Sequence, residues 1–384
     1  MNELFNGARL KEARYYNSLS ITQLANKLSI SKQMVSKYEN GKSSPRPEIM
    51  FGIMKVLGFP KEFFYGKYKK RLYTNGTFYR SLLTSTQKQK APSDVVMRAS
   101  TIYRDFLENY VEFPETVKYA FDEQDPEVAA SLLRQKWGLG SNPISNMMNL
   151  LEKHGFTIIL LPERMEKVSA FGSNRIIENR KYYTIAVDKQ SSFFKQQFSL
   201  AHELGHWVMH ADSWNPEDLE NSEYRKMEQQ ANNFAAAFLL PKNLFIRDVT
   251  GVKKLDDIFE KKKVWYSSGA AIIQRMRQLG LIDDNYYLRL QKQISYRHLR
   301  KVEPFDQDAS YMLKSPSLLR RATELVVDSG IVSASELPKK IQQMYGVMYP
   351  NRLLESLALL PYGYFDFAEG NNVENLLKIN TNRS

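Results

Sequence analysis

The sequence predicts an α+β protein that is mostly helical, with an all-helical N-terminal domain, a central domain with a small sheet and a helical C-terminal region. Two observations predict this class. Apolar residues recur at helical spacing along most of the 384 residues. Three short apolar stretches, 157–161, 169–172 and 182–187, are typical of strands. Because the chain is longer than one typical domain and is 43% hydrophobic, we expect two or three domains with ordinary cores.

Composition narrows the chemistry that the chain can perform. The sequence has no cysteine, which excludes disulfides, a thiol nucleophile and a Cys-based zinc site. Only histidines and carboxylates remain as metal ligands. The N-terminus lacks the apolar core of a signal peptide, and no stretch approaches eighteen uninterrupted apolar residues. We therefore expect a soluble, cytoplasmic protein without membrane partners.

The positive charge of the chain, +12 overall, is concentrated at its N-terminus. Residues 1–70 hold thirteen Lys and Arg, five Glu and no Asp. A surplus of this kind is typical of a segment that binds a polyanion, although a solvated basic surface would have the same composition. The helical pattern decides between the two.

Residues 1–66, the head, show the pattern of short helices joined by turns. A first helix carries apolar residues from Leu4 to Ala13, Ser20 or Thr22 caps a second over 23–28, and Ser31 caps a third over 32–39. This is helix-turn-helix spacing, in which the third helix enters the DNA major groove. Val35 and Tyr38 should face the core. We expect DNA contacts from Gln23, Lys32, Gln33, Ser36, Lys37, Asn40 and Lys42, with Gln33 able to pair with adenine.

Three of the five histidines fall within nine residues, and the first two frame the pattern His-Glu-x-x-His. On a helix, positions i and i+4 share a face, so His202 and His206 can bind one zinc ion. Glu203 is turned about 100° away, where it can reach a water on the metal without ligating it. Glu203 is therefore the expected general base. A packed helix with incidental histidines is the alternative.

A catalytic zinc needs a third protein ligand and an open position for water. Glu228, near the start of a second apolar helix, is the first candidate, with Glu223 and Glu220 as lesser ones. Asn232 lies one turn after Glu228 and could orient a ligand. His210 is a weaker candidate, because two residues one turn apart share an ion more easily than three in line.

The remaining segments set the domain organisation. Residues 67–94 are basic and polar with turn signals at Asn75-Gly76 and Ala91-Pro92, as in a linker, and helices are expected over 95–111, 126–137 and 144–154. The predicted domains are the head, a linker and connecting helix (67–125), a metal-binding domain (126–245), a helical module with a second helix-turn-helix-like element (246–305) and a helical region without a recognisable motif (306–384).

Two resemblances rest on these segments. The head resembles the XRE, or lambda-repressor-like, helix-turn-helix family through Thr22-Gln23-Leu24-Ala25, residues 31–42 and Pro45. The body resembles the ImmA/IrrE metallopeptidases, a gluzincin-like family. Its matching features are residues 133–140, 143–144, 151–156 and 198–206, Glu228 with residues 231–241, and residues 267–271, 275–281 and 303–304. The family usually has Arg where this chain has Gln197, which puts a local salt bridge in doubt.

The resemblance implies a regulator that joins an operator-binding head to a zinc endopeptidase with one ion per chain. Glu203 would take a proton from water on the zinc and pass it to the departing amine. Tyr182, Tyr183 and Tyr224 are candidate oxyanion stabilisers. The implied substrate is a repressor, an antitoxin-like protein or the chain itself, with relief of repression of stress or mobile-element genes. Helix-turn-helix heads usually bind paired half-sites as homodimers. The alternatives are a repressor whose zinc-binding body is a non-catalytic sensor or scaffold, and a free-standing peptidase with a vestigial head.

Overall fold

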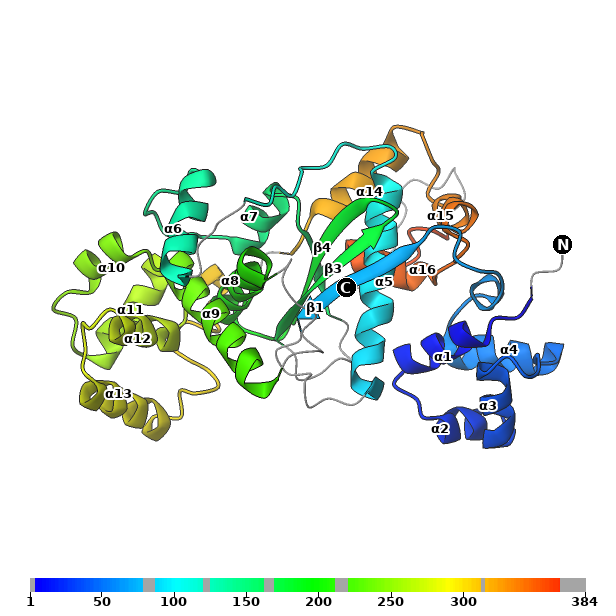
Figure 1. Cartoon of the computed structure of the whole chain (residues 1–384), viewed down its shortest axis with the longest axis horizontal. Coiled ribbons are helices and arrows are strands. Elements are labelled where there is room, and N and C mark those ends of the chain that lie inside the picture. Colours follow the sequence, from blue (N-terminus) through cyan, green and yellow to red (C-terminus); the bar gives the residue numbers. More distant parts are fainter. Residues whose placement is uncertain are drawn as a thin grey trace, which may run out of the picture.

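The computed structural model describes residues 4–78, 87–119, 125–161, 169–210, 220–311 and 315–366. Figure 1 shows the helical head at one end of the long axis, a large helical group at the other end, and a small sheet between them. The α+β, mostly helical class is confirmed. None of the helices in these segments combines the length and apolarity needed to cross a membrane.

The head consists of four α-helices and a short 3-10 turn. Two of its helices begin where the sequence places a capping serine: Ser31 accepts from the Met34 amide, and Ser20 forms a capping box with Gln23. The first helix begins later than expected, since Leu4 lies outside it and is exposed. The elements are α1 (Gly7–Tyr16), α2 (Ile21–Lys27), α3 (Lys32–Glu39), α4 (Pro47–Leu57) and the turn Lys61–Phe64.

A four-stranded sheet lies at the centre of the molecule, in the order β1-β3-β4-β2. The strands are β1 (Leu72–Phe78), β2 (Thr157–Leu160), β3 (Ala170–Ile177) and β4 (Arg180–Val187). The three stretches predicted to be strands are all present, and β3 continues five residues beyond the predicted 172. β2 runs parallel to β4, while β1 and β3 pair antiparallel with their neighbours.

The predicted linker over 67–94 is corrected by the structure. Part of it is the edge strand β1, paired with β3, and Pro92 lies inside helix α5 (Gln87–Leu107) instead of in a turn. An edge strand needs backbone bonds from one neighbour only, so a polar composition does not reveal it. Pro92 removes one backbone donor from α5, but the buried face from Val95 to Leu107 stabilises the helix through packing.

The two faces of the sheet belong to two different apolar cores. Tyr182 and Ala186 face the core that contains α5, whereas Tyr183 and Ile185 face the core that contains helix α8 (Phe193–His210). This alternation along β4 follows from the two-residue period of a strand. The remaining helices of the second core are α6 (Pro126–Lys136), α7 (Met147–Lys153), α9 (Asn221–Leu239), α10 (Lys242–Val249), α11 (Leu255–Trp265), α12 (Gly269–Gln278) and α13 (Asp284–Tyr296).

The C-terminal helices share the first core with the head. They are α14 (Leu318–Asp328), α15 (Leu337–Tyr345) and α16 (Asn351–Ala358). Arg9 of α1 donates to the Gly346 carbonyl at 2.7 Å, and the ring centroids of Phe63 and Tyr349 are 6.0 Å apart. The head and the C-terminal region, at opposite ends of the sequence, therefore form one packed unit. The predicted domain limits remain predictions.

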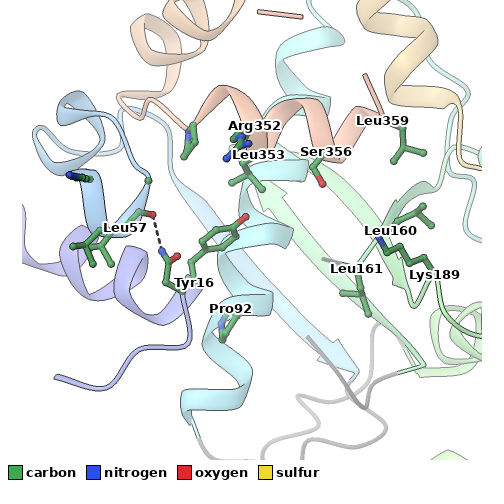
Figure 2. A pocket seen from close by; sticks show the side chains of 15 residues that line it. Tyr16, Leu57, Pro92, Leu160, Leu161, Lys189, Arg352, Leu353, Ser356 and Leu359 are labelled. Atoms are coloured by element: carbon green, nitrogen blue, oxygen red, sulfur yellow. Dashed lines mark hydrogen bonds between the residues drawn. The ribbon is translucent and has the colours of Figure 1, made fainter. Parts of the chain in front are cut away.

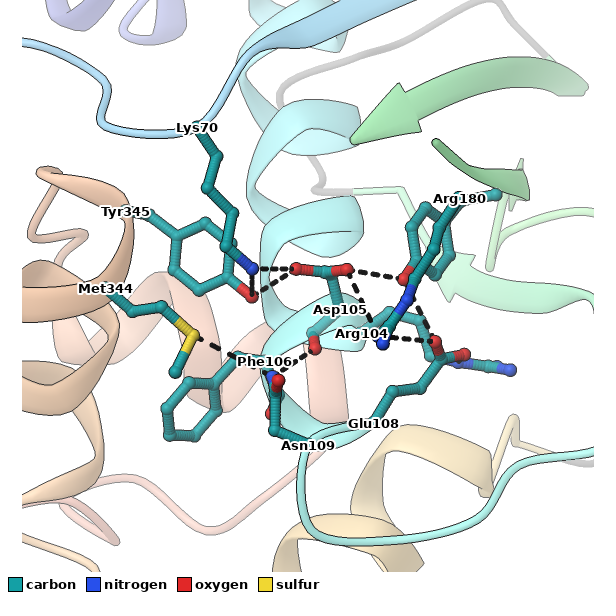
Figure 3. Close-up of polar contacts among 10 residues, drawn as sticks. Lys70, Arg104, Asp105, Phe106, Glu108, Asn109, Arg180, Met344 and Tyr345 are labelled. Carbon is teal, nitrogen blue, oxygen red and sulfur yellow. Dashed lines mark hydrogen bonds and ion pairs between the residues drawn. The ribbon is translucent and has the colours of Figure 1, made fainter. Parts of the chain in front are cut away.

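A buried carboxylate joins this unit to the sheet (Figure 3). Asp105 of α5, 1% exposed, accepts a hydrogen bond from the Tyr182 hydroxyl at 2.6 Å and another from Tyr345 of α15. Lys70, just after the head, pairs with the same carboxylate at 2.9 Å. Asp105 thus fastens the segment that leaves the head to both α15 and β4.

Candidate metal centre and nucleic-acid face

Helix α8 places its first two histidines side by side. The Nε2 atoms of His202 and His206 are 3.0 Å apart, and both side chains are 1% exposed. The i,i+4 spacing accounts for this geometry, because it puts both rings on the face that α8 turns toward α9.

Helix α9 adds the third ligand atom. The Glu228 carboxylate lies 3.5 Å from Nε2 of His202 and 3.3 Å from Nε2 of His206, and the ligand atoms of this group lie within 4.8 Å of one another. Ligands held tetrahedrally by zinc stand about 3.3 Å apart. The donor set therefore fits a zinc ion. The lesser candidates Glu220 and Glu223 are exposed and form the capping box at the start of α9.

Polar partners hold each ligand in orientation. The Asn232 side chain lies 3.1 Å from Nδ1 of His202, and the Tyr224 hydroxyl donates to Glu228 at 2.9 Å. His210, the alternative ligand, instead faces Nδ1 of His206 at 3.3 Å and lies outside the three-residue group. Such partners fix the tautomer and direction of metal ligands. Tyr224 precedes Glu228 by one helical turn, a spacing that could have revealed its role.

His210 connects His206 to Gln230 through a chain of hydrogen bonds. If His206 presents Nε2 to a metal, its Nδ1 carries the proton and donates to Nδ1 of His210. His210 must then donate from Nε2 to the Gln230 side-chain oxygen, 3.1 Å away. Burial and the neighbouring His206 lower the pKa of His210 to about 4. The His210 imidazole is therefore neutral, as these hydrogen bonds require. Burial raises the pKa of Glu228, but its two imidazole partners outweigh burial and lower it.

Glu203 is buried on α8 beside the first ligand, with 1% of its surface exposed. The three candidate tyrosines have different positions. Tyr182 faces Asp105 on the far side of the sheet, which excludes it from the site. Tyr183 donates to the Glu203 backbone carbonyl at 3.4 Å, and Tyr224 binds Glu228. Tyr224 is thus the one of the three that touches a ligand side chain.

A glycine between the two histidines lets the helices approach. A Cβ at Gly205 would stand 3.1 Å from the Ala231 carbonyl oxygen and 3.1 Å from the Phe234 ring of α9. Larger side chains here would push α9, and with it Glu228, away from α8. Gln197 joins α8 to the start of α7, because its side chain accepts from the Met147 amide at 2.8 Å and donates to the Ile144 carbonyl at 2.9 Å. Two neutral hydrogen bonds thus connect the two helices at Gln197.

A groove of about 690 Å³ opens beside the ligands. Its wall includes Glu228 and Asn232, and amide side chains from α9 and α12 continue it away from the metal group: Gln229, Asn233, Gln274 and Gln278. Amides donate and accept hydrogen bonds, as the backbone of an extended peptide requires. The arrangement can therefore hold a peptide against the metal group.

The predicted DNA face lies at the outer end of the head (Figure 1). Val35 and Tyr38 are buried as predicted. Of the predicted contact residues, only Ser36 is half-buried. The exposed ones are Gln23, Lys32, Gln33, Lys37, Asn40 and Lys42. Gln23 also caps α2, so its oxygen is engaged with the Ser20 amide at 2.8 Å. Asn40 donates back to the Ser36 carbonyl at 2.8 Å.

The head docks on the body through a different surface. Glu12 of α1 pairs with Arg98 of α5 at 2.5 Å, while α3 packs on α1 and α2. A bidentate pair between Arg14 and Glu39, at 2.5 and 2.9 Å, fastens α3 to α1. The recognition helix therefore keeps its outward face free of this docking contact.

Comparisons with known proteins match two segments. Residues 10–64 match the helix-turn-helix family HTH_3, and residues 151–264 match the IrrE N-terminal-like domain of the Peptidase_M78 family. No curated protein matches the chain. A solved Mycobacterium tuberculosis transcriptional regulator is 16% identical, with a TM-score of 0.28, over 46% of this chain and 50% of its own. The chain thus spans about half the length of that structure.

Proposed function

Because residues 10–64 are a helix-turn-helix domain and residues 151–264 a metallopeptidase-type domain, we propose that this DNA-binding regulator is also a zinc-dependent endopeptidase. The observation that carries the proposal is the convergence of His202, His206 and Glu228 on one point, with Glu203 buried next in sequence to His202. Three protein ligands leave one position open, as catalytic zinc sites do.

The residues of the site divide the work of peptide hydrolysis. A bound zinc ion would act as a Lewis acid toward water and a peptide carbonyl. His202, His206 and Glu228 would hold the ion, while Asn232 and His210 keep the imidazoles in their ligating tautomers. The Glu203 carboxylate would accept a proton from the attacking water and return it to the departing amine.

The substrate we propose is a repressor, an antitoxin-like protein or the chain itself, and its cleavage would relieve repression of stress or mobile-element genes. The amide-lined groove supports a peptide substrate bound in an extended form. The docked head supports regulation at an operator, because its DNA face remains open while the peptidase is attached.

Metal analysis and a cleavage assay test the enzymatic half. We expect about one zinc per purified full-length chain and cleavage of a product of a neighbouring gene. A chelator should abolish cleavage and added zinc should restore it. A chain that binds zinc, binds DNA and cleaves none of these proteins or itself would favour the non-catalytic sensor instead.

Two substitutions in α3 test the DNA-binding half on an operator selected from random-sequence DNA. Gln33→Ala should weaken binding by about 1–3 kcal/mol and relax base preference at one position. Lys37→Ala should weaken all sequences alike and reduce the slope of log affinity against log salt by about 1. Lys61→Ala, on the 3-10 turn away from α3, is the matched control. Binding that does not depend on salt or sequence would support the vestigial-head alternative.

A further inference from the structure

Two pockets of about 610 and 690 Å³ lie in the described part of the chain. The smaller one lies where the head meets α16, and two of its cations, Lys189 and Arg352, stand on separate walls (Figure 2). The larger one is the groove beside the metal group, where a cation and a metal ligand belong to the same helix, α9. The charges of the groove therefore bear on which peptide it binds.

One face of α9 lines the groove. Its members share that face because they recur every three or four residues: Arg225, Glu228, Asn232 and Ala236. This stripe is about 16 Å long, the length of about five residues of an extended peptide. Gln278 of α12 donates to Asn233 at 2.9 Å, which places the amide side chains beyond Glu228. Along α9 the metal ligand thus lies between Arg225 and the amide-lined part of the groove.

Arg225 is an exposed cation that pairs with none of the carboxylates in the described segments. Glu228, one turn further along α9, is the one carboxylate among the described residues that line the groove. Its oxygens already face the two imidazoles and the Tyr224 hydroxyl. Lys195 of α8 also lines the groove, and a bound divalent ion would add more positive charge beside Arg225. The groove therefore favours a carboxylate from the peptide at this end.

We propose that the groove selects peptides with an Asp or Glu within about two residues of the scissile bond, its carboxylate paired with Arg225. This inference rests on the proposed peptidase function and names the class of its substrate. Arg225 lies about 4.5 Å before Glu228 along the helix axis, and an extended peptide advances about 3.3 Å per residue. The acidic residue lies on one side of the scissile bond, and the amide-lined part binds the backbone on the other. Arg225 is thus a specificity residue.

Peptide pools test the proposal on the full-length chain. The peptides are about ten residues long, longer than the groove, with both ends blocked. Each pool has a fixed central Asp, Asn or Lys and no charged residue elsewhere, and a second Asn pool has a free C-terminus. Binding is measured with the zinc-loaded Glu203→Gln chain, which keeps the ligand group. We expect the Asp pool to bind about fivefold more tightly than the blocked Asn pool, and the Lys pool to bind most weakly.

The wild-type chain gives the position of the acidic residue. It should cleave the Asp pool within about two residues of the Asp, and the masses of the fragments show on which side.

Three further variants, each made in the Glu203→Gln chain, assign the preference to one side chain. Arg225→Gln should bind the Asp and Asn pools equally, and Arg225→Glu should prefer the Lys pool. Lys226→Gln is the matched control, because Lys226 is exposed at the next position and does not line the groove. We expect it to keep the preference for Asp.

The proposal is wrong if the zinc-loaded chain binds the Asp and blocked Asn pools alike, or if Arg225→Gln keeps the preference. It is also wrong if the free C-terminus alone is favoured, since the groove would then capture the end of a chain. A preference for Asp without cleavage by the wild type would contradict the peptidase function and leave the selection of acidic peptides standing.

Discussion

Replacing Glu203 with Gln is expected to slow substrate cleavage about 10³-fold while zinc content stays at the wild-type level. The amide is nearly the same size as the carboxylate, but it cannot accept a proton at neutral pH. The ligand group of His202, His206 and Glu228 is left intact. Cleavage rate and bound zinc are measured on the same preparations.

The matched control for this experiment is Glu223→Gln. It removes the same charge from the first turn of α9, where the side chain is exposed and outside the ligand group. We expect its cleavage rate to stay within a few-fold of wild type. Equal rates in the Glu203 variant and the wild type would contradict the proposed role of Glu203, and loss of zinc from it would make Glu203 a ligand.

Replacing Lys262 with Met is expected to destabilise the protein by about 3–5 kcal/mol. Lys262 is fully buried, and its ammonium group donates at 2.8 Å to each of Glu303, Asp306 and the Pro304 carbonyl. Without the lysine, two buried carboxylates would lose their counter-charge. The free energy of unfolding from urea titration measures the loss.

The same substitution should also disturb the wall of the groove beside the metal group. Glu303 accepts from the Gly269 and Ala270 amides at the start of α12, at 2.7 and 3.1 Å, and α12 forms one wall of the groove. Lys263→Met is the neighbouring control, because Lys263 forms an ion pair with exposed Glu260. We expect it to cost less than about 1 kcal/mol. Similar losses in the two variants would show that the buried cluster contributes little to stability.

The parts of the site that the sequence predicts depend on local periodicity. His202 and His206 are one turn apart on α8, and Glu228 and Asn232 are one turn apart on α9, so one helical pattern places each pair. The head is predictable for the same reason, since its caps and apolar positions are local signals. Local periodicity does not determine which carboxylate meets the histidines, because the contact of Glu228 with them joins two helices.

The features that the sequence did not reveal are contacts between distant residues. β1 is held by pairing with β3 about a hundred residues later. The polar sequence of this edge strand does not indicate that pairing. The bond from Arg9 to the Gly346 carbonyl spans most of the chain. Tyr182 and Tyr183 are adjacent and equally plausible in sequence, and only the faces of the sheet separate their roles.

The sheet with two occupied faces limits how this protein can be divided. Removal of residues 315–384 would remove α14, α15 and α16 from the first core and expose α5 and the adjoining sheet face to solvent. The truncated chain would then expose an apolar surface, and its aggregation could be mistaken for loss of the proposed activity. Point substitutions in the intact chain are for this reason the sound way to assign its activities.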